Sequence, residues 1–354
     1  MERHWQNIID NKRNPVHWLP VALLWLISLG YRLVLYFHER FLPTPVTASC
    51  PVISVGNLTV GGTGKTPVTI MLAQYLVKRK KTVAIVSGGY GRKGSDNVIA
   101  IGRKIRQCPV AEVGDEVVMM AESLPDVIFA VGRSKSEMAL KLRERNPDVI
   151  IIDDGFQHRR LHRDFNVLLF DAGCDICREA LFPLGRLRET LRAIARADCV
   201  ILNHGIGPGG EADLRMWFEE NHPGLPLSEI GRINENIVTN NLILPLKDIK
   251  GKRIYALAGI GNGDAFIAGL TARLGDMAGF RLFGDHCAYT DADISHIRAD
   301  IEELQPDCML TTHKDYVKLR GFDFGVEMYY VDLSLKFRSG KEEFFDCLRR
   351  KIER

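Results

Sequence analysis

The stretch PVISVGNLTVGGTGKTP, residues 51–67, decides the fold of this chain. Residues 51–55 form a short apolar run that predicts a β-strand ending at Gly56. From Pro67 to Lys80 the apolar residues recur at the spacing of a helix. A glycine-rich loop between a strand and a helix is the setting in which backbone N–H groups bind phosphate oxygens. The sequence therefore predicts a phosphate-binding loop over residues 59–66.

Two side chains of this loop suit a nucleoside triphosphate with Mg²⁺. Lys65 is placed to reach the β- and γ-phosphates, and the Thr66 hydroxyl is placed to bind the metal ion. The loop departs from the usual P-loop pattern at its first position, which is Thr59 instead of glycine. The predicted nucleotide-binding residues are Thr59, Val60, Gly61, Gly62, Thr63, Gly64, Lys65 and Thr66.

Apolar runs separated by helical stretches continue on the C-terminal side of the loop. They lie at residues 82–87, 127–131, 149–152, 167–170 and 200–202. Continuous apolar strands alternating with helices indicate a parallel sheet that is covered on both faces. We therefore expect an α/β fold of the P-loop NTPase type.

The length of 354 residues favours about two domains. A glycine-rich segment at 205–210 and a polar segment at 234–241 mark a change in composition. We expect an N-terminal apolar helix within residues 1–45, a P-loop domain over 46–230 and a smaller α/β domain over 231–354. In the smaller domain the pattern predicts strands at 253–258, 308–311 and 326–331, with helices at 263–275, 291–304 and 340–353.

Two acidic pairs are candidates for the chemistry. Asp153 and Asp154 follow the apolar run 149–152, which places carboxylates at the carboxyl end of a strand, where they can hold Mg²⁺. The alternative is that one of them caps a helix or turn. Asp115 and Glu116 follow a glycine, and either carboxylate is able to accept a proton from an attacking hydroxyl. Taken alone, this second pair is more typical of an acidic surface turn.

The segment 18–37, WLPVALLWLISLGYRLVLYF, is much more apolar than the rest of the chain. It is long enough to span a bilayer. Its second half is amphipathic and its tryptophans and tyrosines suit the headgroup layer, so a membrane-associated helix lying in the interface is the interpretation that we favour. A buried core helix is the third. A cleaved signal peptide is disfavoured, because the run begins late and has no small-residue cleavage site.

The charge balance and the cysteines argue against nucleic-acid binding, a disulfide framework and a zinc site. The 47 basic and 44 acidic residues leave a formal charge of +3, which does not indicate a nucleic-acid-binding protein. The eight cysteines are scattered, which is typical of free thiols in a reducing compartment. Cys174 and Cys177 form an isolated C-x-x-C pair without the two further ligands that a zinc site needs.

Six motifs occur in an order that is specific to one family. They are GNLTVGGTGKTP at 56–67, SGGYGR at 87–92, VGDE at 113–116, DDGFQH at 153–158, PLGRLRE at 183–189 and TTHKDYVK at 311–318. With them, nearly the whole chain resembles the tetraacyldisaccharide 4′-kinase family. The resemblance implies transfer of the γ-phosphoryl group of ATP to the 4′-hydroxyl of a tetraacylated glucosamine disaccharide 1-phosphate, giving lipid IVA. It also implies work at the cytoplasmic face of the bacterial inner membrane, with no obligate protein partner and no nucleic acid.

The resemblance implies roles for individual residues. Asp115 resembles the catalytic base of the family and Glu116 its tuning partner, while Asp153 and Asp154 support Mg²⁺. His286, in the sequence Gly284-Asp285-His286, resembles a family histidine near the nucleotide or the base. The positions that match family residues around the acceptor or the phosphates are Tyr90, Arg133, Gln157, Arg186 and Arg188. Val117 and His313 depart from the family pattern, and His313 receives no role.

A P-loop switch GTPase or ATPase, of the protein-insertion or metallochaperone type, is the alternative function. A guanine-reading switch needs Asn-Lys-x-Asp after a strand. The nearest match, Thr312-His313-Lys314-Asp315, has the lysine and the aspartate adjacent to each other and does not fit.

Overall fold

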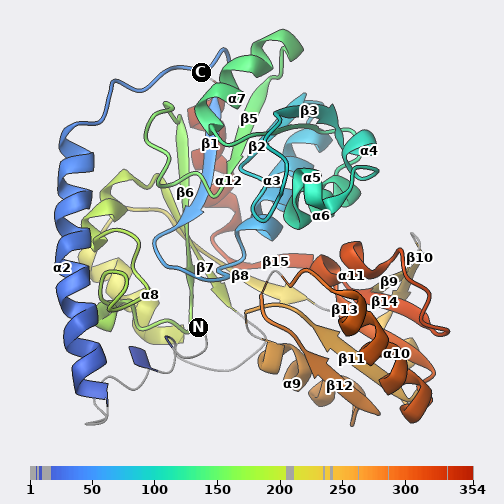
Figure 1. The fold of residues 1–354 in the computed structure, drawn as a ribbon. Coiled ribbons are helices and arrows are strands. Elements are labelled where there is room, and N and C mark those ends of the chain that lie inside the picture. The colour runs from blue at the N-terminus through green and yellow to red at the C-terminus, as the bar shows by residue number, and fades with distance from the viewer. Residues whose placement is uncertain are drawn as a thin grey trace.

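The computed structural model describes Trp5, Ile8, Ile9 and residues 17–204, 211–233, 236–239, 242–261, 263–285, 287–332 and 334–353. Two β-sheets organise these residues, one of nine strands and one of six. Figure 1 shows the two sheets in separate bodies, with a long N-terminal helix along one side of the larger body.

The strands of the large sheet are β1 (Val52–Asn57), β2 (Val83–Ser87), β3 (Val98–Ile101), β4 (Ile128–Val131), β5 (Val149–Asp153), β6 (Phe165–Asp171), β7 (Cys199–His204), β8 (Leu227–Ile233) and β15 (Ser334–Ser339). Those of the small sheet are β9 (Asn236–Thr239), β10 (Leu242–Pro245), β11 (Ile254–Ala258), β12 (Gly279–Leu282), β13 (Cys308–Thr312) and β14 (Glu327–Val331).

The α-helices are α2 (Trp18–Arg40), α3 (Lys65–Lys78), α4 (Gly102–Ile105), α5 (Val110–Val113), α6 (Asp115–Ser123), α7 (Lys135–Lys141), α8 (Glu211–Asn221), α9 (Gly263–Leu274), α10 (Asp291–Leu304), α11 (His313–Leu319) and α12 (Lys341–Ile352). Short 3₁₀ turns are η2 (Leu142–Arg145), η3 (Ile176–Arg178), η4 (Leu191–Arg196) and η5 (Leu246–Ile249).

The large sheet has the strand order β15-β8-β7-β6-β1-β5-β2-β4-β3. All neighbours from β8 to β4 are parallel, which confirms the predicted parallel sheet. The edge strands β3 and β15 are antiparallel to their neighbours. Every residue of β1 and β5 is buried, because helices cover both faces of the sheet.

Alternate residues of β1 point to opposite faces and so build different cores. Ile53 and Val55 pack with residues of α3, α6 and α12 on one face. Val52 packs on the other face with Met138 of α7. Because β1, β2, β4 and β5 are parallel, their carboxyl ends share one edge of the sheet. The loops that leave this edge carry the candidate site residues.

The small domain differs from the boundary that the sequence predicted. Its sheet, in the order β10-β9-β14-β13-β11-β12, ends at Val331, and the chain then returns to the large sheet as β15 and α12. Phe344, Phe345 and Leu348 of α12 are buried in the same core as α3. Because α12 packs this apolar side against the large sheet, the predicted assignment of residues 334–353 to the smaller domain was wrong. The smaller domain is instead inserted between β8 and β15 of the large sheet (Figure 1).

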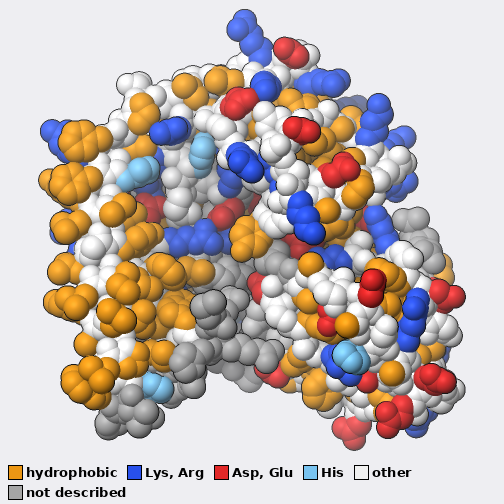
Figure 2. All heavy atoms as spheres, in the orientation of Figure 1, with side chains coloured by type: hydrophobic (Ala, Val, Ile, Leu, Met, Phe, Trp, Pro, Cys, Tyr) orange, Lys and Arg blue, Asp and Glu red, His pale blue; other side chains and the backbone are white. Residues whose placement is uncertain are grey.

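Helix α2 is not a core helix, which rules out one of the three interpretations of its sequence. Ser28 is its one buried residue, whereas Trp18, Leu23 and Phe37 are each more than half exposed. Among the described residues it is the one helix long and apolar enough to cross a membrane. Figure 2 shows its apolar side chains as a continuous column along one edge of the molecule.

Candidate active site

The predicted phosphate-binding loop lies between β1 and α3, as expected. Gly64 has φ +86° and begins helix α3 from a left-handed conformation, which glycine adopts at little cost. The Asn57 side chain donates to the Thr59 carbonyl at 2.8 Å, and the Asn203 side chain of β7 donates to the Thr63 carbonyl at 2.8 Å. The Thr63 hydroxyl is buried with no hydrogen-bond partner among the described residues. Because buried hydroxyls usually have a partner, it is a candidate hydrogen-bond donor to a phosphate oxygen.

The start of the loop explains why threonine replaces glycine at position 59. Thr59 pairs with Leu187 in an antiparallel bridge. Two further backbone bonds flank the bridge, from Val60 N–H to the Arg186 carbonyl at 2.7 Å and from Arg188 N–H to the Leu58 carbonyl at 2.7 Å. Thr59 is not among the residues with positive φ, so the backbone there does not require glycine.

Lys65 and Arg188 converge on Asp154. The Lys65 ammonium lies 3.7 Å from the Asp154 carboxylate and 3.3 Å from the Asn57 side-chain oxygen. Arg188 donates to both carboxylate oxygens of Asp154 at 3.1 Å. Burial by itself raises the pKa of Asp154, but Lys65 and Arg188 more than offset this, and the pKa is lowered. Asp154 is therefore ionised and surrounded by cations.

Asp153 experiences the opposite environment. It is buried, and the Thr69 hydroxyl of α3 donates to its carboxylate at 3.2 Å. Burial raises the pKa of Asp153, and the negative charge of Glu116 raises it further. This mutual repulsion shows that the two predicted acidic pairs lie near one another. A divalent cation would relieve it, so these residues fit Mg²⁺.

The described residues contain no group of three or more His, Cys, Asp or Glu side chains able to hold a metal ion by themselves. Mg²⁺ needs no such group, because it usually takes one or two protein carboxylates and completes its shell with phosphate oxygens and water. Asp153, Asp154 and Thr66 remain the residues that would hold it.

Lys135 belongs to the site, although the sequence analysis did not identify it. Its ammonium donates to the backbone carbonyls of Asp153 and Asp154 at 2.8 and 2.6 Å. Burial lowers its pKa. The available signal was its position at the first turn of α7, directly after the parallel strand β4. Lys135 fixes the backbone of the acidic pair, and Asp154 has a left-handed φ of +49° there.

Asp115 and Glu116 begin helix α6, so they are not an exposed acidic turn. Asp115 is 4% exposed and its carboxylate accepts from the Glu116 backbone N–H at 2.8 Å. Two acidic residues in the first turn interact favourably with the helix dipole. Gly114, with φ +94°, packs against the backbone of Gly89 and Tyr90, which brings the Tyr90 loop next to the acidic pair.

Lysines from the small domain contact this acidic pair. Lys318 of α11 lies 2.9 Å from the Asp115 carboxylate, and both side chains are at most 10% exposed. Lys314, on the same helix, lies 3.7 Å from Glu116 and 3.2 Å from Asp285. The motif at 311–318 thus contributes cations to the site.

The remaining predicted residues lie in different surroundings. Tyr90 and Arg133 are exposed, in loops that follow β2 and β4 at the same sheet edge. The Gln157 side chain donates to the Asn57 carbonyl at 2.8 Å, so it holds the start of the loop. The Arg186 guanidinium pairs with Glu179 at 3.3 Å. His286 lies outside the described residues.

Two hydrogen bonds hold helix α2 beside this site. Its Tyr31 hydroxyl donates to the Arg188 carbonyl at 2.8 Å, and its Ser28 hydroxyl donates to the Leu181 carbonyl at 3.1 Å. The segment that carries Arg188 therefore lies between the phosphate-binding loop and the apolar helix.

Comparisons with known proteins agree with this geometry. A family model described as tetraacyldisaccharide-1-P 4′-kinase matches residues 17–353. Two proteins named tetraacyldisaccharide 4′-kinase are each 36% identical. That of Geobacter metallireducens aligns over 85% of this chain and 89% of its own length. That of Syntrophus aciditrophicus aligns over 93% and 92%. The crystal structure of the "apo" form of LpxK from Aquifex aeolicus in complex with ATP superposes with a TM-score of 0.74 at 29% identity, over 94% of this chain and 99% of that one.

Proposed function

The chain belongs to the tetraacyldisaccharide-1-P 4′-kinase family, and on that premise we propose the following reaction. The enzyme transfers the γ-phosphoryl group of ATP to the 4′-hydroxyl of a tetraacyldisaccharide 1-phosphate, and the product is lipid IVA, a precursor of lipid A in lipopolysaccharide biosynthesis. The observation that carries the proposal is the convergence of three family motifs at one sheet edge. The phosphate-binding loop, the acidic pair after β5 and the acidic pair at the start of α6 meet there.

The transfer step needs a base, an electrophile and charge neutralisation. Asp115 accepts the proton of the 4′-hydroxyl while that oxygen attacks the γ-phosphorus. The bond to the β,γ-bridging oxygen breaks, and ADP leaves with that oxygen. Lys65 neutralises charge on the transferred phosphoryl group, and Lys318 keeps the Asp115 carboxylate in place beside it. Such a reaction depends mainly on positioning and on stabilising negative charge.

Mg²⁺ would be held by Asp153, Asp154 and the Thr66 hydroxyl, together with phosphate oxygens of ATP. When bound, it supplies positive charge to the phosphates. The chain's own part is to keep these carboxylates oriented, with Lys135 fixing their backbone and Thr69 donating to Asp153.

The switch GTPase alternative is disfavoured by the surroundings of residues 312–315. Asp315 is fully buried and accepts from the Gly259 N–H at 2.8 Å and from the Tyr289 hydroxyl at 2.9 Å. It also caps α11 with Thr312. This aspartate is therefore a structural residue, and it is not available to read a guanine base.

The apolar column of α2 supports work at a membrane surface. The acceptor's acyl chains stay in a bilayer, whereas ATP is in the cytoplasm, so the enzyme acts at the cytoplasmic face of the inner membrane. The helix associates with that face by its exposed tryptophans and leucines and by Phe37.

A direct assay tests the reaction. Purified full-length protein is incubated with γ-labelled ATP, Mg²⁺ and tetraacyldisaccharide 1-phosphate in detergent micelles. We expect label to move to the lipid and the product to carry a 4′-phosphate. Hydrolysis of GTP without any lipid labelling would contradict the proposed function and favour a switch protein.

A further inference from the structure

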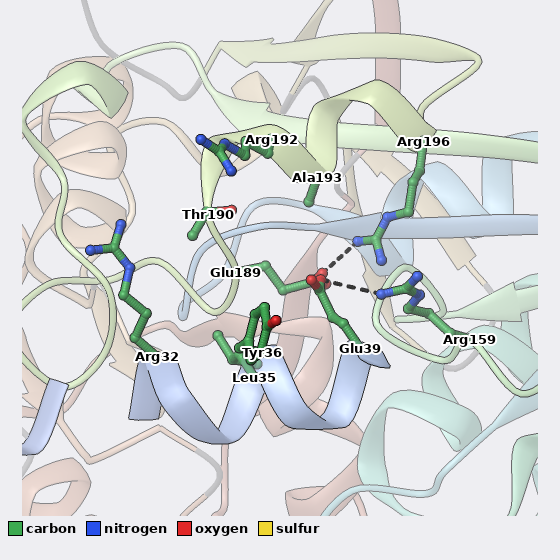
Figure 3. Close-up of a pocket in the computed structure, with 10 residues that line it drawn as sticks. All are labelled: Arg32, Leu35, Tyr36, Glu39, Arg159, Glu189, Thr190, Arg192, Ala193 and Arg196. Atoms are coloured by element: carbon green, nitrogen blue, oxygen red, sulfur yellow. Dashed lines mark hydrogen bonds and ion pairs between the residues drawn. The ribbon is translucent and has the colours of Figure 1, made fainter. Parts of the chain in front are cut away.

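A cavity of about 470 Å³ lies between the second half of α2 and the segment 189–196, outside the site described above. Four arginines line it: Arg32 from α2, Arg159 from the loop after β5, and Arg192 and Arg196 from η4. Figure 3 shows Arg32 and Arg192 on one side of the cavity and Arg159 and Arg196 on the other. Glu39 and Glu189 also line the cavity.

The four arginines differ in their partners. Arg159 pairs with Glu39 at 3.2 Å, and Arg196 pairs with Glu189 at 2.7 Å, as the dashed lines in Figure 3 mark. Arg32 and Arg192 are exposed and have no ion pair with any described residue. The cavity therefore keeps two uncompensated positive charges, which match the charge of about −2 on a phosphate monoester at neutral pH.

The paired side of the cavity also has unused hydrogen-bonding capacity. Glu189 is 6% exposed, and one of its carboxylate oxygens is buried without a partner. On Arg196, Nε and one terminal nitrogen are buried donors without a partner. Buried donors usually find partners in native proteins, so unsatisfied ones beside a cavity point to a ligand that accepts hydrogen bonds.

A second cavity, of about 350 Å³, adjoins the first and shares Arg32 and Thr190 with it. It is lined mainly by apolar side chains, including Trp25, Leu29 and Leu184. A basic cavity that continues into an apolar one along a membrane-facing helix fits an amphiphile with an anionic head and an acyl chain.

The basic cavity is also connected to the reacting end of the site. Glu189, which lines the cavity, directly follows Arg188, which binds Asp154. One residue of extended chain spans at most about 3.6 Å, so the chain segment that lines the cavity is the same one that reaches Asp154.

We propose that this cavity is the subsite for the 1-phosphate of the acceptor, with Arg32 and Arg192 as the two guanidinium groups that bind it. The inference rests on the proposed function and adds where the far end of the acceptor binds. Arg159 and Arg196, held by Glu39 and Glu189, are further binding residues that donate to the same phosphate through their remaining N–H groups. Bidentate guanidinium–phosphate bonds fix the orientation of the disaccharide and thereby direct its 4′-hydroxyl toward Asp115.

The test compares two acceptors in detergent micelles, one with and one without the 1-phosphate, on wild-type enzyme and the double variant Arg32→Gln/Arg192→Gln. We expect wild-type KM to be lower for the phosphorylated acceptor, and the double variant to lose that advantage, with KM raised about 10- to 100-fold on the phosphorylated acceptor alone. The KM for ATP and the rate on the unphosphorylated acceptor stay the same. Arg40→Gln/Arg143→Gln removes two exposed arginines that do not line the cavity and serves as the matched control.

Each other outcome has a separate meaning. A double variant that still discriminates between the acceptors as the wild type does overturns the subsite. A loss of equal size on both acceptors overturns it too, because it reveals a structural role for these arginines. Absence of transfer to either acceptor by the wild type contradicts the proposed function itself.

The phosphate could instead belong to a phospholipid of the bilayer, and a vesicle experiment distinguishes the two sources. Binding to phosphatidylcholine vesicles is measured with and without phosphatidylglycerol. We expect the double variant and the wild type to respond equally to the anionic lipid. If the double variant loses only the phosphatidylglycerol-dependent binding and keeps its discrimination between acceptors, the cavity binds a bilayer headgroup and the proposal fails.

Discussion

The phosphate-binding loop and helix α6 both border one site, and their polar groups are held in different ways. The loop is held by neighbours at its own sheet edge, through Asn57, Asn203 and the bridge to Leu187. The acids of α6 are held by the small domain. Lys318 pairs with Asp115, Lys314 with Glu116, and His313 and Arg320 both bind Glu122.

This difference separates a preformed half of the site from a half that depends on how two domains meet. The loop keeps its shape as long as the large sheet is intact. The orientation of Asp115 depends in addition on α11, which belongs to the inserted domain. We therefore expect mutations in the loop to affect nucleotide use directly, and mutations in α11 to act through the stability of the domain contact.

The largest effect is expected from Asp115→Asn on the α6 side. Removing the base should lower kcat by about 100- to 10,000-fold, because general-base catalysis contributes that much. The amide keeps the shape of the side chain, so ATP affinity, measured by calorimetry, should be unchanged. A kcat within a few-fold of the wild type would mean that another group accepts the proton.

On the loop side, Lys65→Ala should lower kcat by about 100- to 1,000-fold, the usual effect of losing one donor to a developing negative charge. Unlike Asp115→Asn, it should also raise the KM for ATP, since Lys65 contacts the phosphates. Steady-state kinetics with ATP varied at saturating acceptor separates the two variants. If Lys65→Ala and Asp115→Asn had the same KM for ATP, the proposed difference between the two sides of the site would be wrong.

Lys318→Met tests the domain contact. Asp115 would stay buried after losing its lysine, and breaking a buried ion pair in this way costs about 3–5 kcal/mol. Urea unfolding should show this loss, and Lys318→Arg should recover most of it, because the charge is kept. If Lys318→Met were as stable as the wild type, the ion pair would not be holding α6.

Lys135→Met is the matching change on the loop side, since Lys135 is a partly buried lysine in the first turn of α7. It bonds to two backbone carbonyls instead of a carboxylate. We expect a smaller loss of stability, about 1–3 kcal/mol, for leaving these carbonyls unpaired. The same urea experiment measures it. A loss larger than that of Lys318→Met would reverse the proposed order of the two contacts.

The smallest effect concerns pH. Burial lowers the pKa of His313 from 6.5 to about 4, so the folded protein keeps this imidazole neutral while the unfolded chain takes up a proton. Its Nε2 lies 2.7 Å from Glu122, and a neutral imidazole donates there because the carboxylate only accepts. The contribution of His313 is complete above about pH 6.5 and is lost as the pH falls toward 4, with a loss of about 1 kcal/mol per pH unit.

Comparison with His313→Gln isolates this contribution. The free energy of unfolding of the wild type should fall more steeply than that of the variant between about pH 6.5 and 5.5. Parallel curves would show that the His313 pKa is the same in the folded and unfolded states.

The sequence was most informative where the chemistry is local. Residues 51–67 contain the strand, the loop and the helix start in one continuous stretch, so the loop could be located from order and spacing alone. The run 149–154 placed Asp153 and Asp154 at a strand end for the same reason. The parallel arrangement also followed, because strands covered on both faces are apolar throughout.

What sequence reasoning missed was set by contacts between distant segments. Nothing in the spacing of residues 334–353 shows that they return to the large sheet, since the apolar face of α12 would suit either sheet. Lys135 and Lys318 are ordinary surface-type residues until the fold buries them against Asp153 and Asp115.

The sequence by itself therefore determined the fold class, the phosphate-binding loop, the acidic pairs and the apolar helix, because each is written in a single run of neighbouring residues. The tertiary structure alone decided which cations face which carboxylates, that the small domain is an insertion, and that Arg32 and Arg192 share a cavity. The physical reason is that charges interact over short distances in space, and only the folded chain brings residues 160 or 200 positions apart to one cavity or into one ion pair.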